Sequence, residues 1–431
     1  FGMKAEGALK MCGVPWAFFP SVQAAWLVSS EPWFKVKPIN MLKLRAGFDM
    51  AGNDALDYFA SRSYLHTVKF YDKSIGLQLG NVENEGIKWE TTSRFNVGLD
   101  AMLLDNRLSL SFDWYTSKTS DLLVQKQYPY VTGMDKYWAN GGELKNTGIE
   151  ATINAKLINT KNWQWELGAS LGHYKNEVTA LDEDVAPVSV YGGEVITKVG
   201  EPVGAFWGYR TEGVLCSSDE ANEAGLFQRD ATGDTEDFKA GDVKFVDVNP
   251  GKDPGCIDEN DKVVIGNPNP DIYGNVFTRL KYKEFQLDVN CNYSVGNDVY
   301  NFYRQQLEGG SNFFNQTTAL ANRWTYDGQN TDIPAIAFGD PMGNARFSDR
   351  WIEDGSYFRV KAIKFSYDIP LVLDWLQGLT VWAAAENVLT FTKYKGSDPE
   401  FSVNNNVLYQ GVDAGLLPQT RSFHLGVKVN L

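Results

Sequence analysis

Oxygen-bearing side chains gather in one short segment of the sequence, between residues 247 and 261. Asp247, Asn249, Asp253, Asp258 and Asp261 surround a turn that also contains glycine. A hard cation such as Ca²⁺ takes six to eight oxygen ligands from side chains of this kind. Carboxylates this close repel one another unless a cation or protons neutralise them. We therefore predict a calcium site here, and a solvated acidic turn without metal is the alternative.

A second pattern with possible chemistry is Gly168-Ala-Ser170-Leu-Gly172, which matches the G-x-S-x-G form of a hydrolase nucleophile elbow. That elbow requires a strained turn from a strand into a helix, which lifts the serine out of the sheet. Here Ser170 lies within an unbroken alternation of apolar and polar residues, and no helical pattern follows. The sequence therefore predicts an ordinary strand residue at this position.

Aromatic side chains in the longest polar segment, about residues 175–271, could bind a ligand. Tyr191, Trp207 and Tyr209 lie in it. Exposed aromatic rings stack on sugars or pack on peptide side chains. We take these three residues as candidate substrate-binding residues, with packing of the segment on its own aromatics as the alternative.

Composition excludes several functional classes. The 40 Lys and Arg residues against 54 Asp and Glu give a formal charge of −14, and no basic cluster occurs, so nucleic-acid binding is not expected. The three histidines, His66, His173 and His424, are too far apart in sequence to suggest a zinc enzyme. The sequence contains no run of about 18 apolar residues, so no membrane-spanning helix is expected.

The elements that must position these residues are strands, because the dominant period is two. Apolar residues alternate with polar ones in pairs of segments joined by short turns, as at 95–101 with 108–114, 149–155 with 163–171, and 276–282 with 285–293. Further strands are expected near 22–28, 42–48, 357–369, 379–387 and 419–431. That makes 11 strands, joined alternately by short and long connections.

The strand length decides between a soluble β-sandwich and a membrane barrel. Strands in sandwiches usually have about 5–6 residues, whereas strands of roughly 9–13 residues can cross a bilayer when tilted. Aromatic residues near the strand ends and the alternation of short turns with long loops also favour a transmembrane antiparallel β-barrel. The apolar face would then contact outer-membrane lipid. Residues such as Lys43, Arg45, Asp113, Glu150 and Glu166 would face the lumen, where they could contact substrate or simply be solvated.

Several segments resemble the SusC/RagA-type TonB-dependent outer-membrane transporters of Bacteroidetes. The matching segments keep the family's order, and they include Phe18-Phe-Pro-Ser-Val22, Asn146-Thr-Gly-Ile-Glu150, Gly200-Glu-Pro-Val-Gly204, Ile265-Gly-Asn-Pro268, Gly355-Ser-Tyr-Phe-Arg-Val-Lys361 and Glu386-Asn-Val-Leu-Thr-Phe-Thr-Lys-Tyr394. The last strand, from Phe423 to Leu431, resembles the signal read by the barrel assembly machinery, although it ends on leucine rather than on an aromatic residue. The family's loop of type Asp-x-Asn-x-Asp-Gly-x-Ile-Asp corresponds to residues 247–258, where Gly251-Lys252 and Pro254 disturb its spacing.

The resemblance implies a function, a fold and partners. It implies an importer of oligosaccharides or peptides without catalysis of its own, working with a SusD-type surface lipoprotein and with the TonB complex. Barrels with a plug have about 22 strands, so residues 1–431 are expected to form the C-terminal half of such a barrel. The TonB box, the plug and the first barrel strands are absent from this sequence. Residues 175–271 would form a long extracellular loop. A passive porin and a secreted β-rich adhesin or enzyme are the alternatives.

An outer-membrane location would also permit disulfide bonds, because the cell envelope is oxidising. Cys216 and Cys256 both lie in the segment 175–271, and the sequence leaves a disulfide between them and two free thiols as alternatives. The sequence contains no C-x-x-C pair that would indicate a zinc ribbon or a redox site.

Overall fold

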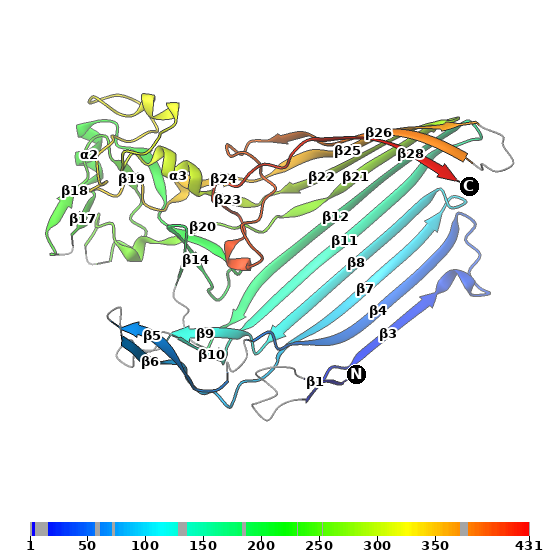
Figure 1. Ribbon diagram of the computed structural model, residues 1–431, viewed down its shortest axis with the longest axis horizontal. Coiled ribbons are helices and arrows are strands. Elements are labelled where there is room, and N and C mark those ends of the chain that lie inside the picture. The colour runs from blue at the N-terminus through cyan, green and yellow to red at the C-terminus, as the bar shows by residue number, and fades with distance from the viewer. Residues whose placement is uncertain are drawn as a thin grey trace.

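An antiparallel sheet of eleven strands dominates the structure, a computed structural model that describes residues 2–4, 16–56, 61–70, 74–127, 136–182, 187–230, 232–251, 253–370 and 378–430 (Figure 1). Each strand pairs with the next strand of the sheet in sequence, which confirms the eleven strands expected from the period-two pattern. In chain order they are β3 (Ser21–Leu27), β4 (Ile39–Asn53), β7 (Glu90–Leu103), β8 (Leu108–Ser120), β11 (Glu143–Asn159), β12 (Trp163–Ala180), β21 (Ile272–Tyr282), β22 (Phe285–Val295), β25 (Tyr357–Ile369), β26 (Gly378–Thr392) and β28 (Ser422–Asn430).

The two faces of this sheet differ in polarity because successive side chains of a strand point to opposite sides. In β8, Phe112 and Trp114 are 44% and 37% exposed on the outer face. Asp113, between them, forms an ion pair with Arg45 on the inner face. On β28 the apolar residues are more open still, with Phe423 80% and Leu425 87% exposed. An apolar outer face and a charged inner face are the pattern of a transmembrane barrel wall. The sheet is not closed, and β3 and β28 are its edges.

Short and long connections lie at opposite ends of the strands (Figure 1). The turn between β7 and β8 is one of the short ones, and Asp105 and Asn106 there have φ of 56° and 61°. Long connections carry small sheets of their own, formed by β5 (Tyr64–Phe70) with β6 (Ser74–Asn81) and by β9 (Leu123–Gln127) with β10 (Lys136–Asn140). We call the two ends the short-turn end and the long-loop end. At the chain's beginning, β1 (Gly2–Lys4) pairs with β2 (Trp16–Phe18).

Three long connections fold together into what we call the outer-loop region, formed by the described parts of residues 181–271, 296–356 and 393–421. Figure 1 shows it as a compact body beyond one end of the strands. Its elements are β13 (Val188–Val190), β14 (Gly193–Ile196), β15 (Ala205–Gly208), β16 (Thr211–Val214), α2 (Ser218–Ala224), β17 (Phe227–Arg229), β18 (Thr235–Asp237), β19 (Val243–Phe245), β20 (Val263–Gly266), β23 (Asp298–Asn301), α3 (Phe302–Glu308), β24 (Ile352–Asp354) and β27 (Val412–Asp413).

The outer-loop region has hydrophobic cores of its own. One core joins Phe206 from the first connection, Tyr300 and Phe347 from the second, and Val412 from the third. The Tyr300 and Phe347 rings meet edge to face at an angle of 70°, with centroids 4.6 Å apart. A second core packs residues of the first connection with Met342 of the second. Since burial of aromatic rings dominates core energetics, the three connections form one folded unit.

Among the residues that the structure describes, no helix combines the length and the apolar character needed to cross a membrane.

Candidate functional site

A hollow of about 690 Å³ lies on the inner, polar face of the sheet, near the long-loop end. Its lining comes from alternate positions of adjacent strands, so the same alternation that makes the outer face apolar builds this polar wall. The lining residues are Asp49, Ala51, Thr92, Arg94, Asn96, Asp113, Tyr115, Ser117, Asn146, Glu150, Tyr174 and Tyr273.

Charged and aromatic groups of this wall are oriented by their neighbours. Arg94 Nε lies 3.2 Å from Asp49 Oδ1, an ion pair between adjacent strands. The Tyr174 and Tyr273 rings meet edge to face with centroids 6.0 Å apart. The Tyr174 hydroxyl donates to Asn269 Oδ1 at 3.0 Å, which links the wall to the outer-loop region. Tyrosine rings beside hydrogen-bonding groups can bind a polar solute by stacking and hydrogen bonding together.

An ion-pair network lies beside this hollow. Arg45 Nε and Nη2 donate to the two carboxylate oxygens of Asp100 at 2.9 and 3.0 Å, and Nη2 also donates to Asp113 Oδ2 at 2.9 Å. Ser111 Oγ donates to Asp100 Oδ1 at 2.9 Å. Gly98 makes room for this arrangement, because a Cβ atom there would lie 2.7 Å from Arg45 Nη2. Arg45 and Asp113 thus face the lumen, as predicted, and are held to one another.

The three aromatic residues predicted to bind substrate have different surroundings. Tyr191 is 42% exposed, and its ring contacts those of Phe302 and Tyr409, with centroids 5.4 and 6.2 Å away. Trp207 is half-buried on β15, with Lys198 Nζ 5.2 Å from its ring centroid. These two keep ring surface open to solvent, so ligand binding by them stays a prediction.

Tyr209 is instead buried, with only 6% of its surface exposed, within the core of the first connection. Its ring packs edge to face on Phe245 at 5.8 Å, and its hydroxyl donates to Glu259 Oε1 at 3.3 Å. The Arg346 guanidinium lies over the same ring, 5.2 Å from the centroid. Burial, and next the negative charge of Glu259, raise the pKa of Tyr209 far above its ordinary value of 10. This position corresponds to the packing alternative and offers no ring face to a ligand.

The acidic turn is held largely by hydrogen bonds to its own backbone. Asp261, 1% exposed, accepts N–H groups of Val248 and Asn249 with Oδ1 and of Asp258 with Oδ2, at 2.8–3.1 Å. Asp258 caps the short 3₁₀ helix Glu259–Asp261 by accepting the Asn260 N–H at 2.7 Å. These bonds engage two of the five predicted calcium ligands.

The remaining predicted ligands differ in whether a carboxylate oxygen lacks a hydrogen-bond partner. Asp253 pairs with Arg229 at 3.2 Å, and Asp247 Oδ2 accepts the Gly255 N–H at 2.7 Å. Asp247 Oδ1 is buried and has no hydrogen-bond partner. Within the described ranges, no three His, Cys, Asp or Glu side chains converge as metal ligands would. Asp247 Oδ1 is thus an oxygen available to a cation. Lys252, one of the residues that disturb the spacing of the loop, lies outside the described residues. Calcium binding by Asn249 and its neighbours stays a prediction.

Cys216 and Cys256 form no disulfide, because both are free thiols, which is the second of the two alternatives left by the sequence. The Cys216 Sγ lies 3.3 Å from Val214 O, just before α2 and beside the chain at Thr331. Cys256 forms an isolated β-bridge with Phe227 of β17.

Ser170 occupies the middle of β12, in an uninterrupted strand. Its hydroxyl donates to Asn275 Oδ1 on the neighbouring strand at 2.8 Å. The strained strand-to-helix turn of a nucleophile elbow does not occur here, so Ser170 is the strand residue that its alternation predicted.

The tyrosines of the inner wall, Tyr115, Tyr174 and Tyr273, were not among the predicted site residues. Tyr115 directly follows the outward Trp114, and the pair suggested only an aromatic strand end. Strand parity could have separated them, because Tyr115 shares the face of Asp113. The meeting of Tyr174 and Tyr273 depends on the register of β12 against β21, in which Gly172 is opposite Tyr273.

This sheet is similar to those of a known protein family. A family model described as "TonB dependent receptor-like, beta-barrel" matches residues 6–388. The TonB-dependent receptor P3 of Formosa agariphila is 32% identical over 96% of this chain and 42% of its own length. The TonB-dependent receptor SusC of Bacteroides thetaiotaomicron is 28% identical over 96% of this chain and 40% of its own length.

Solved structures agree in fold. The structure of the RagAB peptide transporter matches 96% of this chain and 44% of that chain with a TM-score of 0.76 at 24% identity. The RagAB peptide importer in its open-open state gives a TM-score of 0.78 at 22% identity. The chain spans less than half the length of the relatives it matches. It belongs to the TonB-dependent receptor family, and its eleven strands are part of an outer-membrane β-barrel.

Proposed function

We propose that this chain is the C-terminal barrel portion of an importer that takes up oligosaccharides or peptides through the outer membrane with energy from the TonB complex. The observation that carries the proposal is the match of the family model to residues 6–388. The polar inner wall supports it, because Arg94, Glu150 and the tyrosines there can hydrogen-bond to and stack on such solutes. Transport, rather than catalysis, is the activity that we assign.

The proposal places the long-loop end outside the cell and the short turns in the periplasm. In outer-membrane barrels the periplasmic turns are short and the extracellular loops are long. The outer-loop region, including residues 175–271, would then receive a SusD-type lipoprotein and substrate, as the resemblance to SusC/RagA-type transporters implies. TonB would act through the plug and the TonB box that the resemblance to this family implies for the whole transporter.

Dependence on TonB separates this proposal from a passive porin. Uptake of labelled oligosaccharides and peptides would be compared in cells with and without the receptor gene, each in the presence and absence of TonB. We expect uptake that requires both genes. Uptake that needs the receptor but not TonB would instead identify a diffusion pore.

The loop aromatics can be tested in the same assay. Tyr191→Ala and Trp207→Ala are expected to raise the substrate concentration for half-maximal uptake by about tenfold, since stacking contacts of this kind contribute roughly 1 kcal/mol or more. Phe313→Ala, which removes a ring that is 89% exposed elsewhere in the outer-loop region, is the matched control. Unchanged uptake in the first two variants would remove them from the substrate site.

A further inference from the structure

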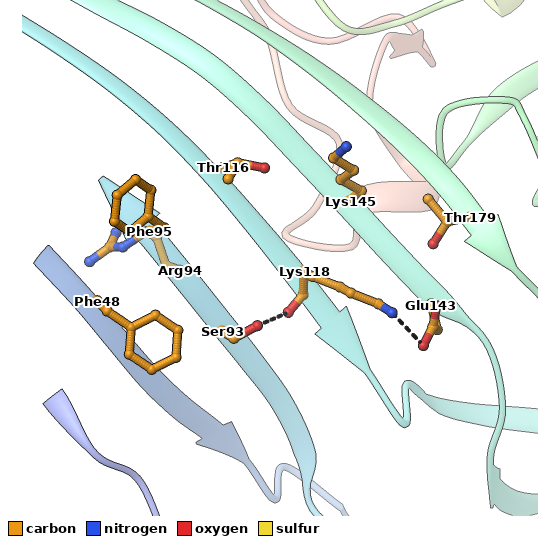
Figure 2. A pocket seen from close by; sticks show the side chains of 9 residues that line it. All are labelled: Phe48, Ser93, Arg94, Phe95, Thr116, Lys118, Glu143, Lys145 and Thr179. Carbon is orange, nitrogen blue, oxygen red and sulfur yellow. Dashed lines mark hydrogen bonds and ion pairs between the residues drawn. The ribbon is translucent and has the colours of Figure 1, made fainter. Parts of the chain in front are cut away.

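A second hollow, of about 360 Å³, lies on the opposite face of the same sheet, the face that contacts lipid. Figure 2 shows Phe48 and Phe95 on one side of it and Lys118 and Lys145 on the other, with the Lys118 ammonium directed at Glu143 and the Lys145 ammonium directed away from it. Thr116, Glu143 and Thr179 also line it. Apolar and cationic groups thus meet in one concavity on the outside of the barrel wall.

The two lysines are direct cross-strand neighbours. In the register of β8 against β11, Lys118 is opposite Lys145. Like charges directly opposite one another on a sheet face are destabilising. Such a pair gains stability from an anion that both side chains can reach.

Acidic neighbours only partly neutralise these charges. Lys118 Nζ lies 2.8 Å from Glu143 Oε1, and Lys175 on β12 lies 2.7 Å from Glu177. Glu177 is opposite Lys145, but its carboxylate is occupied by Lys175. Lys145 itself is exposed and forms no ion pair with any residue in the described part of the chain. Three lysines against two glutamates leave one positive charge in a protein of formal charge −14.

The height of the hollow on the wall matches the lipid headgroups. Phe95 is opposite Thr116, so Lys118 lies two residues beyond the row of Phe95, toward the long-loop end. Two residues of a strand span roughly 7 Å. Phe95 packs against Trp114 with centroids 6.2 Å apart, and aromatic rings of this kind mark the interface between the hydrocarbon and the headgroups. The lysines therefore lie just above the hydrocarbon, at the depth of lipid phosphates.

We propose that this hollow binds the phosphate of an outer-leaflet lipid headgroup between the ammonium groups of Lys118 and Lys145. The acyl chains of the lipid lie against Phe48 and Phe95, which are opposite each other on β4 and β7. Glu143 holds the Lys118 ammonium in the hollow through its ion pair of 2.8 Å. The site is separate from the lumen and from the proposed import function.

The test uses the receptor extracted from the outer membrane and delipidated in detergent. Binding of phosphorylated lipid A, of the same lipid without phosphates, and of inorganic phosphate is measured by native mass spectrometry. Loss of each lysine beside an anionic group is expected to weaken binding about three- to fivefold. We therefore expect the double variant Lys118→Gln with Lys145→Gln to bind phosphorylated lipid A about 10- to 30-fold more weakly. The dephosphorylated lipid should bind the variant and the parent alike.

Matched variants keep the result interpretable. Lys161→Gln with Lys283→Gln removes the same charge from the short-turn end and should leave the affinity within about threefold. Lys145→Arg, which keeps the cation, should do the same. Equal affinity of the parent and the Lys118/Lys145 variant, or an equal loss in the short-turn variant, would overturn the proposal. Full competition by millimolar inorganic phosphate would also overturn it, because the site would then bind free phosphate rather than a lipid.

Discussion

The Arg359 guanidinium and the Asp398 carboxylate form a buried ion pair that fastens the last long connection to strand β25. The Arg359 side chain is 2% exposed and that of Asp398 10%. Asp398 also accepts the backbone N–H groups of Glu400 at 2.9 Å and Gln419 at 3.0 Å, so one carboxylate ties together both ends of this connection.

Replacing Asp398 by Asn is therefore expected to release the connection. The amide keeps the size of the carboxylate but leaves the buried Arg359 charge without its main partner, at a cost of about 2 kcal/mol. Amide hydrogen exchange of peptides covering residues 398–420 should accelerate roughly 30-fold. Glu400→Gln is the control, because Glu400 is more exposed and its contact with Arg359 is 3.3 Å long. An equal effect of both variants would contradict the assignment.

The same carboxylate predicts a dependence on pH. Burial acts to raise the pKa of Asp398, but hydrogen bonds from the Glu400 N–H and the Arg359 guanidinium outweigh it and hold this pKa below the ordinary 3.8. A carboxyl group with a lowered pKa stabilises the fold fully above its ordinary pKa, and this contribution is lost as the pH falls through the lowered value. Limited proteolysis by pepsin should thus cut residues 398–420 only below about pH 3.8 in the parent. In Asp398→Asn the cuts should show no such threshold.

Tyr209 should behave as a core residue and not as a binding residue. Tyr209→Ala removes a buried ring and is expected to destabilise the outer-loop region by about 3–5 kcal/mol. Tyr209→Phe, which loses only the bond to Glu259, should cost about 1 kcal/mol. Trypsin digestion of intact cells would show rapid cleavage of the outer-loop region in Tyr209→Ala alone. Loss of uptake in Tyr209→Phe with unchanged protease resistance would instead support a role in binding.

Gly98 should accept a side chain only if its neighbours shift, because Asp113 Oδ1 and the Arg45 guanidinium occupy the space above it. A methyl group there must displace the guanidinium from Asp100 and Asp113, at a cost of about 1–3 kcal/mol. The temperature at which the barrel loses its folded migration on a gel should fall in Gly98→Ala. Gly378→Ala in β26 is the matched control, since its nearest contact would be an ordinary 3.4 Å to Asn430. Equal temperatures for the two variants would disprove the steric argument.

Calcium binding at the acidic turn can be decided by calorimetry on the receptor in detergent. The sequence predicts binding at about 10⁻⁴–10⁻³ M, the range of extracellular sites. Asp247→Asn should abolish the heat, because Asp247 Oδ1 is the buried oxygen without a partner. Asp258→Ala tests a second predicted ligand in the same titration. Equal heats in all three proteins would leave a turn held by hydrogen bonds alone.

The strands could be predicted from the sequence because alternation is a local property. Phe112, Asp113 and Trp114 already separate the two faces within three residues, and each strand pairs with its neighbour in sequence. Strand ends were less certain. β12 runs to Ala180, beyond the predicted start of the long segment at 175, because polar residues continue its pairing with β11.

The outer-loop region could not be predicted, because its order depends on contacts between segments far apart in the sequence. Phe206 meets Phe347 and Val412 in one core, and no local pattern indicates those partners. For the same reason Tyr209 resembled an exposed loop aromatic, although Arg346 and Phe245 cover it. That Cys216 and Cys256 are free thiols could likewise not be predicted from their spacing in the sequence.

The shared core of the outer-loop region limits how its surface can be re-engineered. Phe206, Tyr300 and Val412 come from three connections, and each buries the others. A loop transplanted singly from a related receptor would bring core residues shaped for different partners, and deletion of residues 175–271 would expose Tyr300 and Val412. A receptor given a new specificity would have to receive all three connections together, whereas a solvent-facing residue such as Phe313, which is 89% exposed, can vary singly.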